Sequence, residues 1–92
     1  SVCDAIVTPM PGEITFPILQ RLCGPGLAVS DEQALHAMAL AFTHLRIVVE
    51  PGGAVALAAA LFADGLPDTV ICTASGGNVD PAVFAGALAR FG

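Results

Sequence analysis

The sequence contains no lysine, and its only fixed cations are Arg21, Arg46 and Arg90. Eight Asp and Glu residues leave a formal net charge of −5 at pH 7. Nucleic-acid surfaces need clustered Lys and Arg, and anionic membrane surfaces attract the same side chains. We therefore expect neither nucleic-acid binding nor membrane-surface binding.

Charged residues of both signs are scarce. They make up 12% of the 92 residues, whereas 55% are hydrophobic. A typical soluble domain carries about 25% charged residues, and a short chain, with its large relative surface, should be more polar still. We therefore expect much of this surface to be covered by further polypeptide or by a partner subunit.

Long hydrophobic runs and paired cysteines are also missing. The longest strictly apolar run, residues 54–63, has ten residues, whereas a membrane-spanning helix needs about 20. No cationic segment precedes an apolar stretch near Ser1, so no signal peptide is visible. Three widely spaced cysteines predict neither a disulfide framework nor a metal site, and we expect buried free thiols in a cytoplasmic protein. They are Cys3, Cys23 and Cys72.

Two helices are predicted in the first half of the chain. Residues 14–23 favour a short helix that accepts Pro17 in its first turn and ends at Gly24 and Pro25. The clearer helix follows Ser30, which forms a capping-box pattern with Gln33. Its hydrophobic residues recur at helical spacing and form one stripe, namely Leu35, Met38, Phe42 and Leu45.

The two histidines of this second helix do not predict a metal site. His36 and His44 lie on the face opposite the hydrophobic stripe, about 12 Å apart along the helix axis. They cannot share a metal ion through that helix alone. We expect both to be solvated surface residues.

The second half of the chain repeats one pattern. Residues 46–65 and 69–91 each read as a β-branched strand, a Gly-Gly turn and a helix, and Asp80 and Pro81 start the last helix as N-cap and first residue. The strands at 47–49 and 69–73 are apolar throughout, as parallel strands buried on both faces are. The pattern predicts one α/β segment over residues 1–92, with three or four mostly parallel strands, flanking helices and a right-handed crossover.

Both Gly-Gly turns follow the carboxyl end of a predicted strand, where open parallel sheets bind ligands. If the two strands are neighbours, Glu50 and Ser75 face the same crevice. Two alternatives stay open: the polar residues of the second turn only cap a helix, and Glu50 only contacts the start of the next helix. The candidate ligand residues are Glu50, Gly52, Gly53, Ser75, Gly76, Gly77 and Asn78.

The two turns together carry a specific resemblance. "RIVVEPGGAVALAAAL" followed by "SGGNVDP" resembles the C-terminal part of the serine/threonine dehydratase family. These fold-type II (tryptophan synthase beta-like) enzymes use pyridoxal 5'-phosphate and include serine racemase and threo-3-hydroxyaspartate ammonia-lyase. "SVCDAIVTPMPGEITFPI" and "VSDEQALHAMALAF" are similar to the family segments that precede this part. One departure is Asp4-Ala5, where the family often has Asp-Gly.

The resemblance implies a role for each candidate residue. Ser75 would hydrogen-bond the pyridine nitrogen of the cofactor, and a neutral hydroxyl there suits elimination. Glu50 would lie near the cofactor or its water network, beside the turn of Gly52 and Gly53. Three residues would shape the wall beside the ring: Gly76, Gly77 and Asn78.

The implied reaction is β-elimination of water from serine- or threonine-type amino acids, which yields a keto acid and ammonia. Since the chain lacks lysine, it cannot form the Schiff base, and we expect no catalytic residue and no activity in this segment alone. The resemblance implies that the missing N-terminal portion of the same enzyme binds most of the cofactor, and that the enzyme is a homo-oligomer without a C-terminal regulatory domain. Alternatives are an amino-acid racemase of the same fold and a non-catalytic α/β interaction module.

Overall fold

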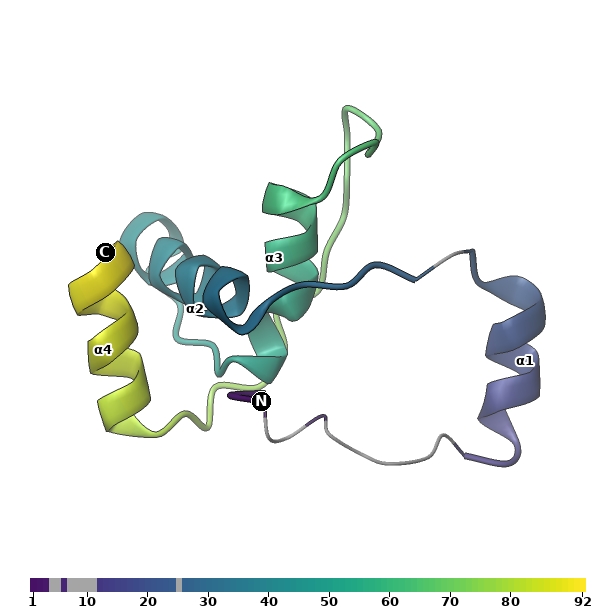
Figure 1. Cartoon of the computed structure of the whole chain (residues 1–92), viewed down its shortest axis with the longest axis horizontal. Helices are drawn as coiled ribbons and strands as arrows, with labels where there is room; N and C mark the ends of the chain where they lie inside the picture. Colours follow the sequence, from purple (N-terminus) through teal and green to yellow (C-terminus); the bar gives the residue numbers. More distant parts are fainter. Residues whose placement is uncertain (4–5, 7–11, 25) are drawn as a thin grey trace.

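The computed structural model describes residues 1–3, 6, 12–24 and 26–92 (Figure 1). Helix α2 packs against both α3 and α4 and so forms the centre of the molecule. The helical elements are α1 (Thr15–Leu22), α2 (Asp31–Leu40), a π-helical turn η2 (Ala41–Leu45), a 3-10 turn η3 (Gly52–Ala54), α3 (Val55–Phe62) and α4 (Pro81–Phe91).

Helix α1 agrees with the predicted short helix. Pro17 lies in its first turn, where a missing N–H costs little, and the helix ends at Leu22, before Gly24. Pro25 lies outside the described residues, as do Asp4 and Ala5. Every residue of α1 is exposed, and within the described part of the chain this helix contacts no other helix.

The predicted capping box at the start of α2 is confirmed. The Gln33 N–H donates to Ser30 Oγ at 3.1 Å, and the Ser30 N–H donates to Gln33 Oε1 at 3.0 Å. Asp31 and Glu32 occupy the first turn, where the helix dipole stabilises their charge. The sequence therefore determines this helix start locally.

The N-terminal residues dock on the same end of α2. Ser1 Oγ donates to Asp31 Oδ1 at 2.8 Å, and the Val2 N–H donates to Asp31 Oδ2 at 3.3 Å. These two hydrogen bonds, the Ser1 bond first, hold the pKa of the Asp31 carboxyl below its usual range. The Asp31 carboxylate thus ties the N-terminal residues Ser1 and Val2 to the start of α2.

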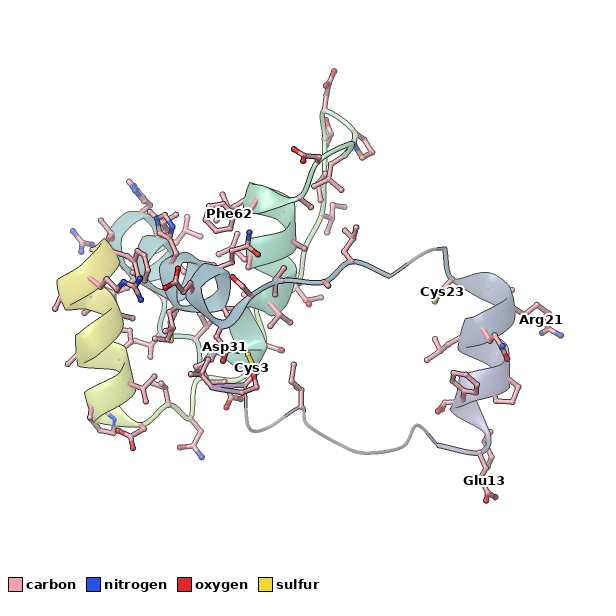
Figure 2. All side chains as sticks on the ribbon, viewed as in Figure 1. Cys3, Glu13, Arg21, Cys23, Asp31 and Phe62 are labelled. Carbon is pink, nitrogen blue, oxygen red and sulfur yellow. The ribbon has the colours of Figure 1, made fainter. Side chains whose placement is uncertain are left out.

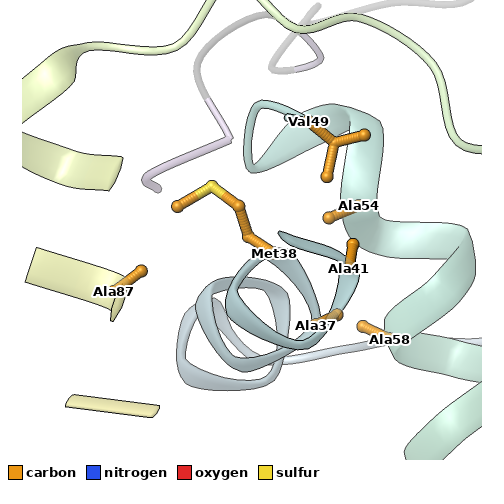
Figure 3. Close-up of a cluster of buried hydrophobic side chains, with 7 residues drawn as sticks. All are labelled: Ala37, Met38, Ala41, Val49, Ala54, Ala58 and Ala87. Carbon is orange, nitrogen blue, oxygen red and sulfur yellow. The ribbon is translucent and has the colours of Figure 1, made fainter. Parts of the chain in front are cut away.

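The core is built mainly from alanine (Figure 3). Met38 is the largest fully buried side chain and extends from α2 between α4 and the start of α3. Small side chains let helix backbones approach closely, but each buries little apolar area. The buried cluster comprises Ala37, Met38, Ala41, Val49, Ala54, Ala58 and Ala87.

The predicted stripe on α2 is only partly confirmed. Met38 is fully buried, and Leu35 and Phe42 are half-buried, but Leu45 is 61% exposed. The backbone changes from α- to π-helical at Ala41, and the wider turn shifts the residues that follow. The 3.6-residue periodicity therefore fails at the end of this segment.

The described residues contain no β-strand, so the predicted parallel strands are not confirmed. Residues 46–50 and 70–80 are irregular, and residues 70–73 run beside α3 (Figure 1). A strand requires a ladder of backbone hydrogen bonds to a neighbour, whereas among the described residues these two segments share one backbone hydrogen bond, from the Glu50 N–H to the Gly76 carbonyl oxygen. Ile71 is 96% exposed, as a β-branched residue without a covering layer would be.

The expectation of three buried thiols is wrong for two of them. Cys3 is buried, whereas Cys23 and Cys72 are exposed. Cys23 follows the exposed helix α1, and Cys72 belongs to the uncovered segment beside α3. Burial of these two thiols would require a covering layer.

The start of α4 agrees with its prediction. Asp80 is the N-cap, and its Oδ1 accepts the Ala82 N–H at 2.7 Å, while Pro81 is the first helical residue.

Helix α3 is apolar but short. Within residues 1–3, 6, 12–24 and 26–92, no helix has the length and hydrophobicity that crossing a bilayer requires.

Replacing the N-cap of α2 should weaken the protein. Ser30→Ala removes one half of the capping box and should lower the free energy of unfolding by about 1 kcal/mol, as measured by urea denaturation. Gln33→Glu keeps the reciprocal bond and should be close to neutral. Equal stability of Ser30→Ala and the unmodified protein would contradict this assignment.

Candidate functional site

The two glycine-containing turns lie against each other. We call residues 50–53 the EPGG turn and residues 75–78 the SGGN loop. The Glu50 N–H donates to the Gly76 carbonyl oxygen at 2.9 Å, and the Ser75 N–H donates to the Gly53 carbonyl oxygen at 3.3 Å. This reciprocal pair of backbone bonds joins segments that are far apart in the sequence.

Glycine is required at this contact because the backbones touch. A Cβ atom at Gly53 would collide with the Ser75 carbonyl oxygen, and it would lie 2.7 Å from the Gly76 carbonyl oxygen. A Cβ atom at Gly77 would lie 2.7 Å from the Val48 carbonyl oxygen. Since real Cβ atoms do not approach that closely, any side chain at these positions would force the turns apart.

Glu50 lies over the SGGN loop. Gly76 adopts a left-handed conformation with φ of 61°, and a Cβ atom there would collide with Glu50 Oε1. The Glu50 side chain is half-buried, which limits its freedom to move away. The structure thus brings the carboxylate of one turn to the glycine of the other.

A small hollow of about 70 Å³ lies beside this contact. Three of its lining residues are polar or charged, namely Glu50, Asn78 and Asp80. Such a space admits water or one polar group of a ligand, not a whole cofactor. Its lining residues are Val2, Glu50, Pro51, Asn78, Val79, Asp80 and Val83.

The SGGN loop presents polar groups to the outside. Ser75, Asn78 and the two glycines between them are exposed, so the hydroxyl, the amide and the loop backbone are accessible to a ligand. Neither turn contains Lys or Arg. In the part of the chain that the structure describes, no group of His, Cys, Asp and Glu side chains could hold a metal ion. The site therefore offers neutral donors beside one carboxylate.

Each turn is attached to a helix that packs on α2. The EPGG turn leads through η3 into α3, and the SGGN loop leads through Val79 into α4. Ala58 of α3 and Ala87 of α4 are buried in the core. The central helix therefore supports both halves of the site.

The interpretation of His36 as a solvated surface residue is wrong. Its ring is half-buried and stacks on Phe91 at a centroid distance of 4.6 Å, with 15° between the planes. Phe62 lies on it at 5.0 Å. Sequence reasoning missed this cluster because its rings come from three helices, although each phenylalanine is the last residue of its own helix. His44 is exposed, as predicted.

The comparison with protein families identifies the chain. A model described as "pyridoxal-phosphate dependent enzyme" matches residues 1–77, which include the whole EPGG turn and all of the SGGN loop except Asn78. The chain belongs to this family of pyridoxal-phosphate-dependent enzymes. The resemblance and the cofactor predicted from the two motifs are thereby confirmed, and the match supports the predicted fold-type II architecture.

Several curated proteins are similar over most of the chain. Serine racemase of Dictyostelium discoideum is 34% identical over 84 residues, which is 87% of this chain and 26% of the relative. L-threonine ammonia-lyase of Geobacter sulfurreducens is 34% identical over 82 residues, covering 87% of this chain and 20% of the relative. The catabolic L-threonine dehydratase TdcB of Staphylococcus aureus is 32% identical over 87 residues, which cover 87% of this chain and 25% of the relative. No solved structure matches the chain.

The chain thus spans about a quarter or less of the length of these relatives.

The residues of the two turns fit one part of the cofactor. An accessible hydroxyl beside exposed glycine backbone suits the edge of a flat pyridine ring, whose nitrogen is a hydrogen-bond acceptor. Neither turn has a Lys or Arg side chain that could pair with the phosphate group.

Substitution of Gly53 by alanine should disrupt the site. The added methyl group would displace the Ser75 carbonyl, and we expect a loss of about 1–3 kcal/mol in the free energy of unfolding. Gly86 is the matched control, since an added Cβ meets nothing within 4 Å. Gly86→Ala lies within α4 and should stabilise by about 0.5–1 kcal/mol. Denaturant unfolding of both variants distinguishes these effects, and neutrality at Gly53 would refute the interlocked arrangement.

Proposed function

We propose that this chain is the C-terminal cofactor-domain segment of a pyridoxal-phosphate-dependent hydroxy-amino-acid dehydratase, or ammonia-lyase. Its family membership and its threonine ammonia-lyase and dehydratase relatives support this assignment. The observation that carries the proposal is the reciprocal hydrogen bonding of the EPGG turn and the SGGN loop. It holds the Ser75 hydroxyl on an exposed loop, where a ring nitrogen can accept its proton in a hydrogen bond.

The proposed substrates are serine, threonine or 3-hydroxyaspartate. Bound pyridoxal phosphate supplies an electron sink that acidifies the α-proton of the amino acid. The substrate loses that proton and its β-hydroxyl as water, and the resulting enamine tautomerises to an imine. Hydrolysis of the imine consumes one water and releases a keto acid and ammonia, so that the atoms balance.

Ser75 would set the electronic state of the ring nitrogen. Its hydroxyl donates a hydrogen bond to the nitrogen, but unlike a carboxylate it does not stabilise a full positive charge there. A neutral Ser75 hydroxyl would leave the cofactor a weaker electron acceptor than a carboxylate at this position would. A neutral side chain at this position thus suits elimination.

Glu50 and the other loop residues would hold this hydroxyl in place. Glu50 lies over Gly76 and borders the small hollow, where it can order water beside the ring. Gly52 and Gly53 form the neighbouring turn, and Gly77 and Asn78 form the wall beside the ring. These roles are positional, since none of these groups has to exchange a proton with the substrate.

The Schiff-base lysine has to come from outside this sequence, which contains no lysine. We propose that an N-terminal portion of the same enzyme supplies it, together with the phosphate-binding residues, and that residues 1–92 alone are inactive. The exposed hydrophobic residues, Ile71 and Leu45 among them, would then be covered by that portion. We further propose a cytoplasmic homo-oligomer that acts on small amino acids.

Racemisation is a second candidate because a serine racemase is among the relatives, at 34% identity. It uses the same cofactor and the same ring contacts. It also needs an acid or base on the face of the substrate carbon opposite the lysine. The residues of the two turns do not discriminate between these reactions, whereas the product does.

Product analysis tests the reaction. The full-length protein that contains this chain should convert L-serine, L-threonine or threo-3-hydroxyaspartate to keto acid and ammonia in equal amounts. The 92-residue segment alone, with added cofactor, should produce neither. Predominant D-serine would favour the racemase. A full-length protein that fails to bind the cofactor would favour the non-catalytic interaction module.

Removal of the Ser75 hydroxyl tests the ring contact. Ser75→Ala should lower kcat/KM up to about tenfold, which corresponds to one neutral hydrogen bond. Ser75→Thr keeps the hydroxyl and should retain most of the activity. The ¹⁵N shift of ring-labelled cofactor in the holoenzyme should change in the alanine variant only. An unchanged shift would place the Ser75 hydroxyl away from the ring nitrogen.

A further inference from the structure

The ends of two helices meet on His36. Phe62 closes α3 and Phe91 closes α4, and both rings lie on the imidazole, at 5.0 and 4.6 Å between centroids. Figure 2 shows Phe62 extending from α3 toward α2. Contacts of this geometry stabilise more than their buried area alone accounts for. The three rings join α2, α3 and α4 at one point.

A second contact reinforces the α4 side of this stack. The Arg90 guanidinium carbon lies 4.8 Å from the centre of the Phe91 ring, and Arg90 Nη2 donates to Glu32 Oε1 at 2.6 Å. Both charged side chains are more than half exposed, so the ion pair itself stabilises little. Its effect is to hold the guanidinium against the Phe91 ring.

The opposite ends of the same two helices carry the site. The EPGG turn overlaps η3 and leads into α3, and the SGGN loop precedes α4. At 1.5 Å per residue, the 8 residues of α3 and the 11 residues of α4 span about 12 Å and about 16 Å between turn and stack. Between these ends, Ala58 of α3 and Ala87 of α4 are buried in the core, and the Phe84 ring of α4 packs edge-on against Phe42 of η2, at 5.3 Å between centroids. Alanine contacts allow close approach but resist sliding and tilting weakly. The orientation of the two helices therefore depends on their aromatic contacts, and the stack on His36 is the one that α3 and α4 share.

We infer that His36 is a positioning residue for the cofactor site. Its stack with Phe62 and Phe91 sets the angle between α3 and α4, and this angle sets the separation of the EPGG turn and the SGGN loop. The Ser75–Gly53 hydrogen bond, at 3.3 Å, is at the long end of its class and would break on a small displacement. The inference rests on the proposed function, in which the SGGN loop meets the cofactor ring.

Cofactor affinity in the full-length protein tests this inference. The apoenzyme is titrated with pyridoxal phosphate and followed by absorbance. His36→Ala removes the stack and should raise the dissociation constant of the cofactor up to about tenfold. His36→Phe keeps a flat ring and should restore affinity, because stacking rather than hydrogen bonding is the cause.

Leu35→Ala is the matched control. Leu35 precedes His36 in α2, is half-buried and packs on the same core. This variant loses packing without touching the stack, so its melting temperature should fall while its cofactor affinity stays unchanged. If His36→Ala fails to fold, Phe91→Leu tests the same stack, since it keeps apolar bulk and removes the flat face.

Two results would overturn the inference: unchanged cofactor affinity in a folded His36→Ala or Phe91→Leu variant, or an equal loss in His36→Phe and His36→Ala. A loss in Leu35→Ala as large as in His36→Ala would also overturn it, because general destabilisation would then be the cause. Failure of the proposed function looks different. The unmodified protein would bind the cofactor and release no keto acid, and the affinity comparison would still decide the role of His36.

Discussion

The contact between the EPGG turn and the SGGN loop is the constraint on which the rest of the site depends. Two reciprocal backbone hydrogen bonds join the turns, and two glycines, Gly53 and Gly77, allow the main chains to touch. Backbone contacts of this kind leave no space for a side chain, so the contact requires glycine at these positions. The glycines of a cofactor loop are usually explained by the room they leave for a ligand. Here they also leave room for the neighbouring turn.

The core that supports this contact is unusual in its small side chains. Alanines bring α3 and α4 close to α2, but they bury little area and constrain helix orientation weakly. Aromatic contacts add to this constraint: Phe84 of α4 packs on Phe42, and the rings at the far helix ends stack on His36. This small core leaves apolar residues such as Ile71 exposed. The proposed N-terminal portion of the enzyme would cover them, in agreement with a chain that spans about a quarter or less of its relatives.

The family match and the site geometry give different information about the cofactor. The family match gives the cofactor, and the structure gives an accessible hydroxyl and amide on a loop without cations. A neutral donor set suits the nitrogen edge of the ring and leaves the phosphate and the Schiff base to residues outside the two turns. The relatives include both lyases and a racemase.

Local features were predictable from the sequence because neighbouring residues cause them. The capping box at Ser30 and the Asp80 N-cap agree with the structure, as does the turn at Gly52 and Gly53, and the two motifs identified the family and its cofactor. Features that depend on distant partners were not predictable. β-Branched residues predicted strands, but a strand exists only where a neighbour completes its hydrogen-bond ladder. The environment of His36 was missed because two other helices create it. The sequence alone determined the helix starts, the turns and the cofactor, whereas the tertiary structure decided which turns touch and which rings stack, because both require segments far apart in the chain to pack together.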